Sequence, residues 1–173
     1  NHDRYSCPHG VYPTAGADRW CALSIHDDAE WVAFKKALEE PEWTKSPALM
    51  TEAGRRAAAP ELDRGIAEWT AARSREEVVR TLRAAAIHVA PVNDMADLHS
   101  DPQLNARQVF RPLAHGALGS YMGVGPPFAL SETPANLSHG APLLGEHTRQ
   151  VMRDMLGISD DECERLEREH AFD

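Results

Sequence analysis

Apolar side chains recur with a helical period in three stretches of the first half of the chain, residues 27–40, 61–72 and 74–86. Apolar residues at i, i+3, i+4 and i+7 place one continuous stripe on a helix, so each stretch predicts a helix with one buried face. The predicted buried residues are Trp31, Phe34 and Leu38, then Leu62, Ile66 and Trp69, then Val78 and Leu82. Two helices begin at capping boxes, Asp27 with Glu30 and Ser74 with Glu77, and Pro41 ends the first.

Short extended segments flank these helices. Residues 11–25 predict two strands joined by the turn-rich stretch 14–18, and the second strand, residues 20–25, is expected to be mostly buried. Residues 87–90 predict a further strand that stops at Pro91. Strands and helices in this order indicate an α+β domain.

Glycine and proline become frequent from residue 111 to residue 142, which indicates extended chain with little core of its own. Short strands are expected at residues 110–113, 121–124 and 128–130. Predicted helices cover residues 101–108, after Asp101-Pro102, residues 146–156, closed by Gly157, and a charged segment capped by Ser159 and Glu162. The tail has few apolar positions, so we expect it to need a partner to pack against.

Composition and charge indicate the class of protein and exclude some classes of partner. With 42% hydrophobic and 26% charged residues, the chain has the composition of a globular protein. A net charge of −9 argues against a nucleic-acid partner, because phosphate binding requires clustered Lys and Arg. The basic residues Arg55, Arg56 and Arg64 instead lie among acidic ones, a mixture typical of solvated helix faces.

No apolar run approaches the roughly 20 residues of a membrane span, so we expect no membrane association. The chain also shows no basic, apolar secretory leader. Its three cysteines, Cys7, Cys21 and Cys163, are far apart, which favours a reducing, cytoplasmic location over a disulfide framework. Cys21 lies in an apolar run and is expected to be a small core residue.

Candidate chemistry is sparse. Cys7 and His9, with His2 nearby, have none of the ligand spacings of a zinc site, so no metal ligands are predicted. The G-x-S-x-G elbow of a Ser/His/Asp hydrolase is missing from the sequence. His26 and Asp27 are the better candidates, because they follow a strand at the point where functional side chains often emerge.

Ordered motifs carry more information than any single residue. They are Pro8-His9-Gly10-Val11-Tyr12-Pro13, Asp18-Arg19-Trp20, Glu30-Trp31, Trp69-Thr70, Ser74-Arg75-Glu76-Glu77, Ala90-Pro91-Val92-Asn93-Asp94, Asp101-Pro102-Gln103-Leu104-Asn105-Ala106-Arg107, Gly125-Pro126-Pro127-Phe128 and Leu144-Gly145-Glu146-His147-Thr148. In this order and over nearly the whole chain, they resemble the C-terminal portion of the class III CoA-transferases, the family of formyl-CoA transferase, carnitine CoA-transferase and alpha-methylacyl-CoA racemase.

The resemblance implies a domain organisation. Members of this family are interlocked homodimers with a large CoA-binding domain of Rossmann type and a smaller α+β domain. Residues 1–7 would be a linker, residues 8–112 the small domain, and residues 113–173 the return segment and C-terminal helices that dock on the large domain. Because the chain begins at Asn1 without an initiator methionine, it is expected to be part of a larger enzyme.

The resemblance also implies the reaction. In the transferases an aspartate attacks the acyl-CoA thioester, and CoA then moves to a carboxylic acid through covalent intermediates on that aspartate. This aspartate and most CoA contacts lie upstream of the matched region, so no catalytic residue is expected here and the chain alone would be inactive and bind no cofactor. Coenzyme A would be a substrate of the complete enzyme, together with an acyl-CoA and a carboxylic acid.

Two alternatives remain open. The racemases use a glutamate just after the strand of the small domain, whereas residues 25–28 contain none, which favours a transferase. A non-catalytic binding module with the same fold is the other possibility. His26 and Asp27 are the residues expected to line the acyl pocket of the complete enzyme.

Overall fold

The chain divides into two compact units, residues 1–95 and 96–173, and the computed structural model describes residues 3–172. Small antiparallel sheets combine with helices, so the predicted α+β class is confirmed. The boundary predicted at residue 112 follows the domain organisation of the family. It stays a prediction, because the division at residue 95 reflects only how compactly this chain packs on itself.

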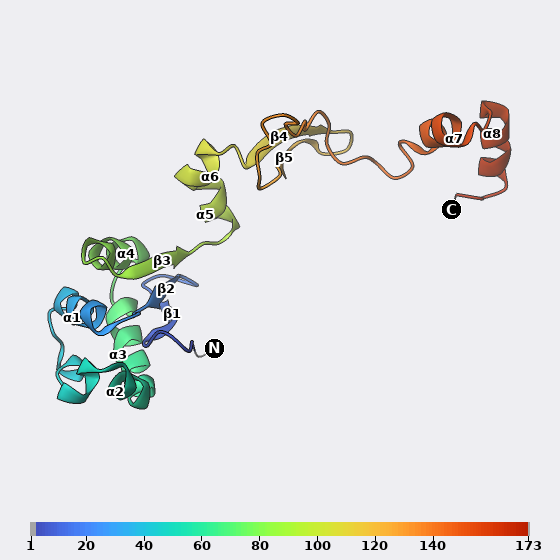
Figure 1. Ribbon diagram of the computed structural model, residues 1–173. Helices are drawn as coiled ribbons and strands as arrows, with labels where there is room; N and C mark the ends of the chain where they lie inside the picture. Colours follow the sequence, from blue (N-terminus) through green and yellow to red (C-terminus); the bar gives the residue numbers. More distant parts are fainter. Residues whose placement is uncertain (1–2, 173) are drawn as a thin grey trace. The chain divides into compact units, whose positions relative to one another are not determined.

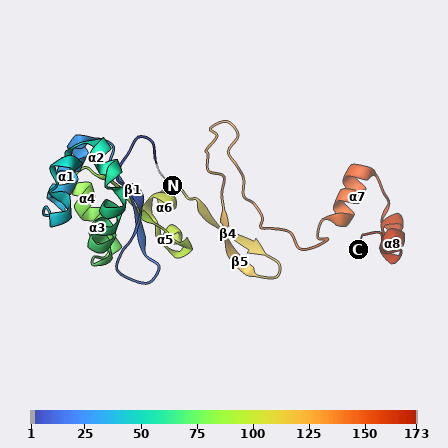
Figure 2. The ribbon, with the colours of Figure 1, turned by 90° about the horizontal axis from the view of Figure 1, so that it is seen from below.

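The first unit is built on a three-stranded antiparallel sheet with the order β1-β2-β3. The strands are β1 (His9–Pro13), β2 (Trp20–Ser24) and β3 (His88–Val92). Figures 1 and 2 show the helices of this unit on one side of the sheet. The sheet therefore has one covered face and one open face.

Side chains of β2 alternate between these faces. Cys21 and Leu23 point to the covered face and are 0% and 3% exposed, whereas Trp20 on the open face is 38% exposed. The strand predicted to be mostly buried is thus half buried, because helices cover only one side of it. Cys21 is the small core residue that the sequence predicts.

Four α-helices and two 3₁₀ turns follow the first hairpin. They are α1 (Asp28–Ala37), η1 (Glu42–Thr44), η2 (Pro47–Met50), α2 (Glu52–Ala57), α3 (Ala59–Ala71) and α4 (Arg75–Ala84). The three predicted helices are α1, α3 and α4, and the two predicted N-caps form, with Asp27 and Ser74 accepting from the backbone N–H groups of Glu30 and Glu77. The short α2 and the 3₁₀ turns had no clear periodic signal.

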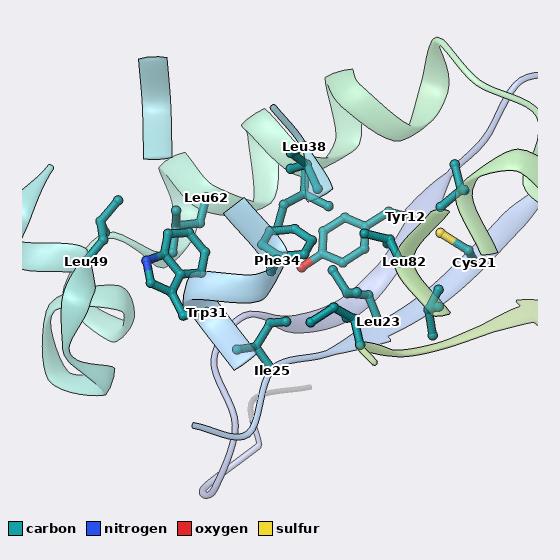
Figure 3. Packing of buried hydrophobic residues seen from close by; sticks show 14 residues of the cluster. Tyr12, Cys21, Leu23, Ile25, Trp31, Phe34, Leu38, Leu49, Leu62 and Leu82 are labelled. Carbon is teal, nitrogen blue, oxygen red and sulfur yellow. The ribbon is translucent and has the colours of Figure 1, made fainter. Parts of the chain in front are cut away.

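The predicted apolar faces of these helices form one core against the sheet. Trp31, Phe34, Leu62, Ile66 and Leu82 are each at most 1% exposed. Figure 3 shows the two aromatic rings of α1 packed among leucines from the other helices and from β2, with Tyr12 of β1 beside them. Trp69, also predicted for this face, is only partly buried.

Strand β3 extends beyond its predicted end. It continues through Pro91 to Val92, and Pro91 pairs with Cys21. The prediction was wrong because β3 is an edge strand, and such a strand tolerates proline where the missing N–H has no neighbour to bond.

The prediction of a solvated surface was also wrong for Arg55, although its neighbour Arg56 is exposed. Arg55 is 0% exposed, and its Nε donates to the Cys7 carbonyl oxygen at 2.8 Å. Its Nη1 donates to the Leu49 carbonyl oxygen at 3.1 Å and lies 2.9 Å from the Asp28 carboxylate. One guanidinium thus joins the N-terminal segment, η2 and the start of α1.

The second unit contains the remaining helices and strands of the described residues. They are α5 (Met95–Ser100), which begins at the last residue of the first unit, α6 (Pro102–Ala106), β4 (Phe110–His115), β5 (Gly119–Val124), α7 (Thr148–Leu156) and α8 (Asp160–Arg168). Strands β4 and β5 pair as an antiparallel hairpin, visible in Figure 2. The predicted caps form at Asp101 and Ser159, and Gly157 closes α7 with φ 66°.

Three predictions for this unit were wrong. The helix expected to begin at residue 146 begins at Thr148, because residues 144–147 form a turn. Residues 128–130 are not a strand, since the Gly125-Pro126-Pro127 segment before them offers few N–H donors for a ladder. The helix expected to reach residue 108 ends at Ala106, and Gln108 has φ 51°. Within the described residues 3–172, no helix has the length and apolar character needed to cross a membrane.

Candidate functional site

A shallow depression of about 1090 Å³ lies on the first unit, and its lining includes side chains of the open sheet face. The strand register sets these side chains beside one another: His9 is paired with Ser24, and Ser24 is paired with His88. Val11 and Ala22 continue the same face with apolar surface. The depression therefore has a polar end and an apolar floor.

The polar side chains at this end are those of His9, Ser24 and His88. They belong to a continuous series of contacts, here called the polar row, which His26 and Glu30 complete. The Ser24 Oγ lies 3.1 Å from His9 Nδ1 and 3.4 Å from His26 Nε2. Beyond it, the Glu30 carboxylate lies 3.3 Å from His26 Nδ1 through Oε2, and 3.2 Å from His88 Nε2 through Oε1. The imidazole rings of His26 and His88 meet edge to face, with centroids 4.4 Å apart.

The turn between β2 and α1 positions this row. Asp27 is the N-cap of α1, and its Oδ1 accepts from the Glu30 backbone N–H at 2.7 Å. In return, Glu30 Oε2 accepts from the His26 backbone N–H at 2.7 Å. These two hydrogen bonds fix the Glu30 carboxylate beside the His26 ring.

A buried hydroxyl lies on the other face of the sheet. Tyr12 is 4% exposed, and its hydroxyl donates to Asp63 Oδ1 at 2.7 Å. Burial, followed by the hydrogen bond to the carboxylate, raises the pKa of Tyr12 above its ordinary value. This tyrosine stays neutral at physiological pH and acts as a hydrogen-bond donor.

The chemistry available in the polar row is that of three imidazoles, one hydroxyl and one carboxylate. Such groups can bind a carboxyl group or a cation, or exchange protons with a ligand. The three cysteine thiols are buried, and burial raises the pKa of Cys21 to about 11, which keeps it from acting as a nucleophile. The row is thus suited to binding and proton exchange rather than to nucleophilic attack.

Comparison with known protein families agrees with the motif order. The model of CoA-transferase family III matches residues 1–148. This chain belongs to CoA-transferase family III.

Relatives of this family III chain are named as transferases. It is 33% identical over 171 residues to a probable CoA-transferase of Mycobacterium tuberculosis, covering 95% of this chain and 21% of the relative. It is 30% identical to the beta subunit of succinyl-CoA–L-malate CoA-transferase of Chloroflexus aurantiacus, covering 96% of this chain and 41% of that subunit. A formyl-CoA:oxalate CoA-transferase of Rhodopseudomonas palustris is also 30% identical, with 83% of this chain and 33% of the relative covered.

A solved structure shares the fold of the family III chain. A CaiB/BaiF family protein from Brucella suis superposes with a TM-score of 0.75 at 21% identity, covering 89% of this chain and 39% of that protein. Together with the relatives above, this shows that the chain spans well under half the length of the proteins it matches.

The structure separates the two residues that the sequence singled out. His26 belongs to the polar row, whereas the Asp27 carboxylate caps α1. Sequence reasoning missed Glu30 and His88 as members of the row. Their strand and helix were predicted, but only the β2–β3 pairing brings His88 next to the turn that carries Glu30.

The structure also shows the surroundings of the Cys7–His9 motif, whose residues the sequence does not predict to be metal ligands. Cys7 is buried, and the His9 ring contacts the hydroxyl groups of Ser6 and Ser24. His2 lies outside the described residues. The motif thus joins the N-terminal segment to the polar row.

Proposed function

We propose that this chain is the C-terminal part of a CoA:carboxylate CoA-transferase, which moves CoA between an acyl-CoA and a carboxylic acid. The observation that carries the proposal is the match of CoA-transferase family III over residues 1–148, together with relatives that are named as transferases. The nucleophilic aspartate and most CoA contacts would come from the part of the enzyme that this chain does not match.

The proposed reaction begins at that aspartate. Its carboxylate attacks the thioester carbonyl carbon and the C–S bond breaks. CoA leaves as the thiolate, and the acyl group and the aspartate are then joined as a mixed anhydride. The thiolate then attacks the aspartyl carbonyl, which releases the donor as its carboxylate and leaves CoA on the enzyme as a thioester. The acceptor carboxylate repeats the sequence in reverse and departs as the new acyl-CoA.

The present chain would supply one wall of the acyl pocket. We assign His26 to that wall, because its ring lies in the polar row beside Ser24, whose side chain lines the depression. Asp27 would contribute by fixing the start of α1 and so the position of the wall. A carboxyl group of the acceptor acid would find hydrogen-bond donors in the histidines.

The second unit supports a docking role for the C-terminal segment. Large apolar side chains such as Leu144, Met155 and Leu156 are 105%, 77% and 64% exposed. A single domain rarely leaves so many apolar side chains open to water, and in our proposal they pack on the large domain and on a second copy of the chain in a homodimer. Alone, the chain would then be inactive.

One observation favours the racemase alternative. Glu30 lies after β2, and its carboxylate contacts both His26 and His88. The racemases use a glutamate after the strand of the small domain. The turn after β2 brings Glu30 to such a place, although it is four residues from His26. An enzyme of that kind would exchange the proton alpha to the thioester.

Two assays with the complete enzyme separate these functions. Transfer of CoA from succinyl-CoA or formyl-CoA to malate or oxalate is expected, and His26→Ala should raise KM for the acid more than it lowers kcat. Incorporation of deuterium at the alpha carbon of a 2-methylacyl-CoA in D₂O, without CoA transfer, would overturn the transferase proposal in favour of the racemase.

A third experiment uses the present chain. Calorimetric titration with CoA and acetyl-CoA should show no binding at micromolar concentration, because the proposed coenzyme contacts lie elsewhere. A micromolar Kd would contradict the assignment of this chain as the part without the CoA site. If neither the complete enzyme nor the chain binds CoA, the non-catalytic module is the correct reading.

A further inference from the structure

Three side chains of the polar row converge in a way that CoA transfer does not require. Among the described residues, His26, Glu30 and His88 place their potential ligand atoms within 4.8 Å of one another. We propose that these three, here called the zinc trio, form a binding site for a divalent transition-metal ion, with Zn²⁺ as its preferred ligand. The proposal does not depend on the function proposed above.

The distances fit a single ion. With bonds of about 2.0–2.1 Å, the ligand atoms of a tetrahedral zinc ion lie roughly 3.3 Å apart. The carboxylate oxygens of Glu30 lie 3.3 Å from His26 Nδ1 and 3.2 Å from His88 Nε2. The two distances involve different oxygens of Glu30, so a rotation of this carboxylate would bring one oxygen to bonding distance of an ion held between the two rings.

The donor set also selects the metal. Two imidazoles and one carboxylate suit zinc and its neighbours, whereas Mg²⁺ and Ca²⁺ prefer oxygen ligands. A tetrahedral ion held by three protein ligands keeps one position for water or another small ligand. The 48% and 63% exposure of the His26 and His88 side chains leaves the trio accessible to an ion from solvent.

Contacts around the trio hold its ligands in orientation. The Ser24 Oγ lies 3.4 Å from His26 Nε2, the ring nitrogen that faces away from Glu30. The Glu30 side chain is only 20% exposed, and its Oε2 accepts from the His26 backbone N–H. Such outer contacts fix the ring tautomer and the carboxylate geometry at metal sites, and their loss weakens binding by about 10- to 100-fold.

The main test is calorimetric titration of the full 173-residue chain with ZnCl₂ at neutral pH, without any affinity tag. One ion per chain with a Kd in the micromolar range or tighter is expected, and MgCl₂ should give no signal. Titration with CoCl₂ should produce the visible absorption of a nitrogen- and oxygen-ligated ion. Acidification should release the metal, because imidazole binds it only in the neutral form.

Variants distinguish the trio from chance binding at surface histidines. His88→Gln and Glu30→Gln should each weaken zinc binding by about 100-fold, and Ser24→Ala by about 10-fold. Exposed His139, in the second unit, provides the matched control, and His139→Gln should leave the Kd unchanged. Glu30→Gln keeps the shape of the side chain, so it reports on the ligand even if His88→Gln destabilises the fold.

Two results would overturn the proposal. The first is an absence of zinc binding below millimolar concentration in the folded chain, which would leave the trio as a hydrogen-bonded cluster. The second is binding that Glu30→Gln and His88→Gln leave unchanged, which would place the ion elsewhere. Circular dichroism of each variant would confirm that the first unit is folded.

Discussion

Replacement of the buried Arg55 by methionine tests how one cation joins three segments of the first unit. Methionine fills a similar volume but has no donor for the carbonyl oxygens of Cys7 and Leu49, which Arg55 contacts at 2.8 and 3.1 Å. A buried acceptor left without a partner costs about 1–3 kcal/mol. Asp28, the ionic partner, is 57% exposed and returns to water at little cost.

The same substitution also removes an unfavourable contribution. Arg55 Nη2 is buried without a hydrogen-bond partner, and burial of any guanidinium carries a desolvation cost. This relief offsets part of the loss, so Arg55→Met is expected to lower the free energy of unfolding by about 3 kcal/mol. That is a large share of the roughly 5–15 kcal/mol that stabilises an ordinary domain.

Urea denaturation followed by tryptophan fluorescence measures this change in the right unit. All four tryptophans lie within residues 1–95, and the ring of Trp31 lies 5.7 Å from the Arg55 guanidinium carbon. Arg64→Met on the exposed side of α3 is the matched control, with an expected change within about 0.5 kcal/mol. If Arg55→Met, like the control, loses less than about 1 kcal/mol, the hydrogen bonds of Arg55 merely balance its desolvation, and the prediction of a net stabilising role is refuted.

Three further predictions concern the same unit. Gly54→Ala should destabilise it by about 2–3 kcal/mol in urea, because a Cβ there would overlap the carbonyl oxygen of Ala48; a change near zero would show that η2 can shift. The raised pKa of Tyr12 means that the folded state keeps a proton that the unfolded state loses above about pH 10, so stability should be full below that pH and fall above it. Tyr12→Phe also removes the bond to Asp63 and about 1 kcal/mol. It should make the decline of stability above about pH 10 shallower, and an equally steep decline would exclude Tyr12 as its cause. The buried thiols, with the pKa of Cys21 raised to about 11, should react with Ellman's reagent at neutral pH only after denaturant is added, and rapid reaction of the native chain would contradict their burial.

Local signals predicted the elements of this protein well. The side-chain N-caps at Asp27, Ser74 and Ser159 all form, because a cap depends on residues only three positions apart. The apolar faces of α1 and α4 are buried as the helical period predicts. Motif order likewise identified the family, since each motif is local and only the order extends along the chain.

Features that depend on distant partners were not predictable in the same way. Arg55 and Arg56 are adjacent, yet one is fully buried and the other exposed, because the carbonyl acceptors of Arg55 come from segments that the sequence does not place. The extent of β3 through Pro91 depends on its being an edge strand, which the order of strands alone decides. His88 joins the polar row by the β2–β3 register, and sequence alone did not supply that register.

The zinc trio of the polar row is nevertheless connected to the core through the backbone. Each member of the zinc trio is bonded in the chain to a buried apolar residue: Ile25 precedes His26, Trp31 follows Glu30 and Ile87 precedes His88. These three neighbours are 0%, 0% and 3% exposed, so the core fixes the backbone of each ligand to within the tolerance of its packing. A site held in this way keeps its geometry without a bound ligand, which is the condition for tight binding at small entropic cost. Packing of the buried core therefore fixes the geometry of the zinc trio.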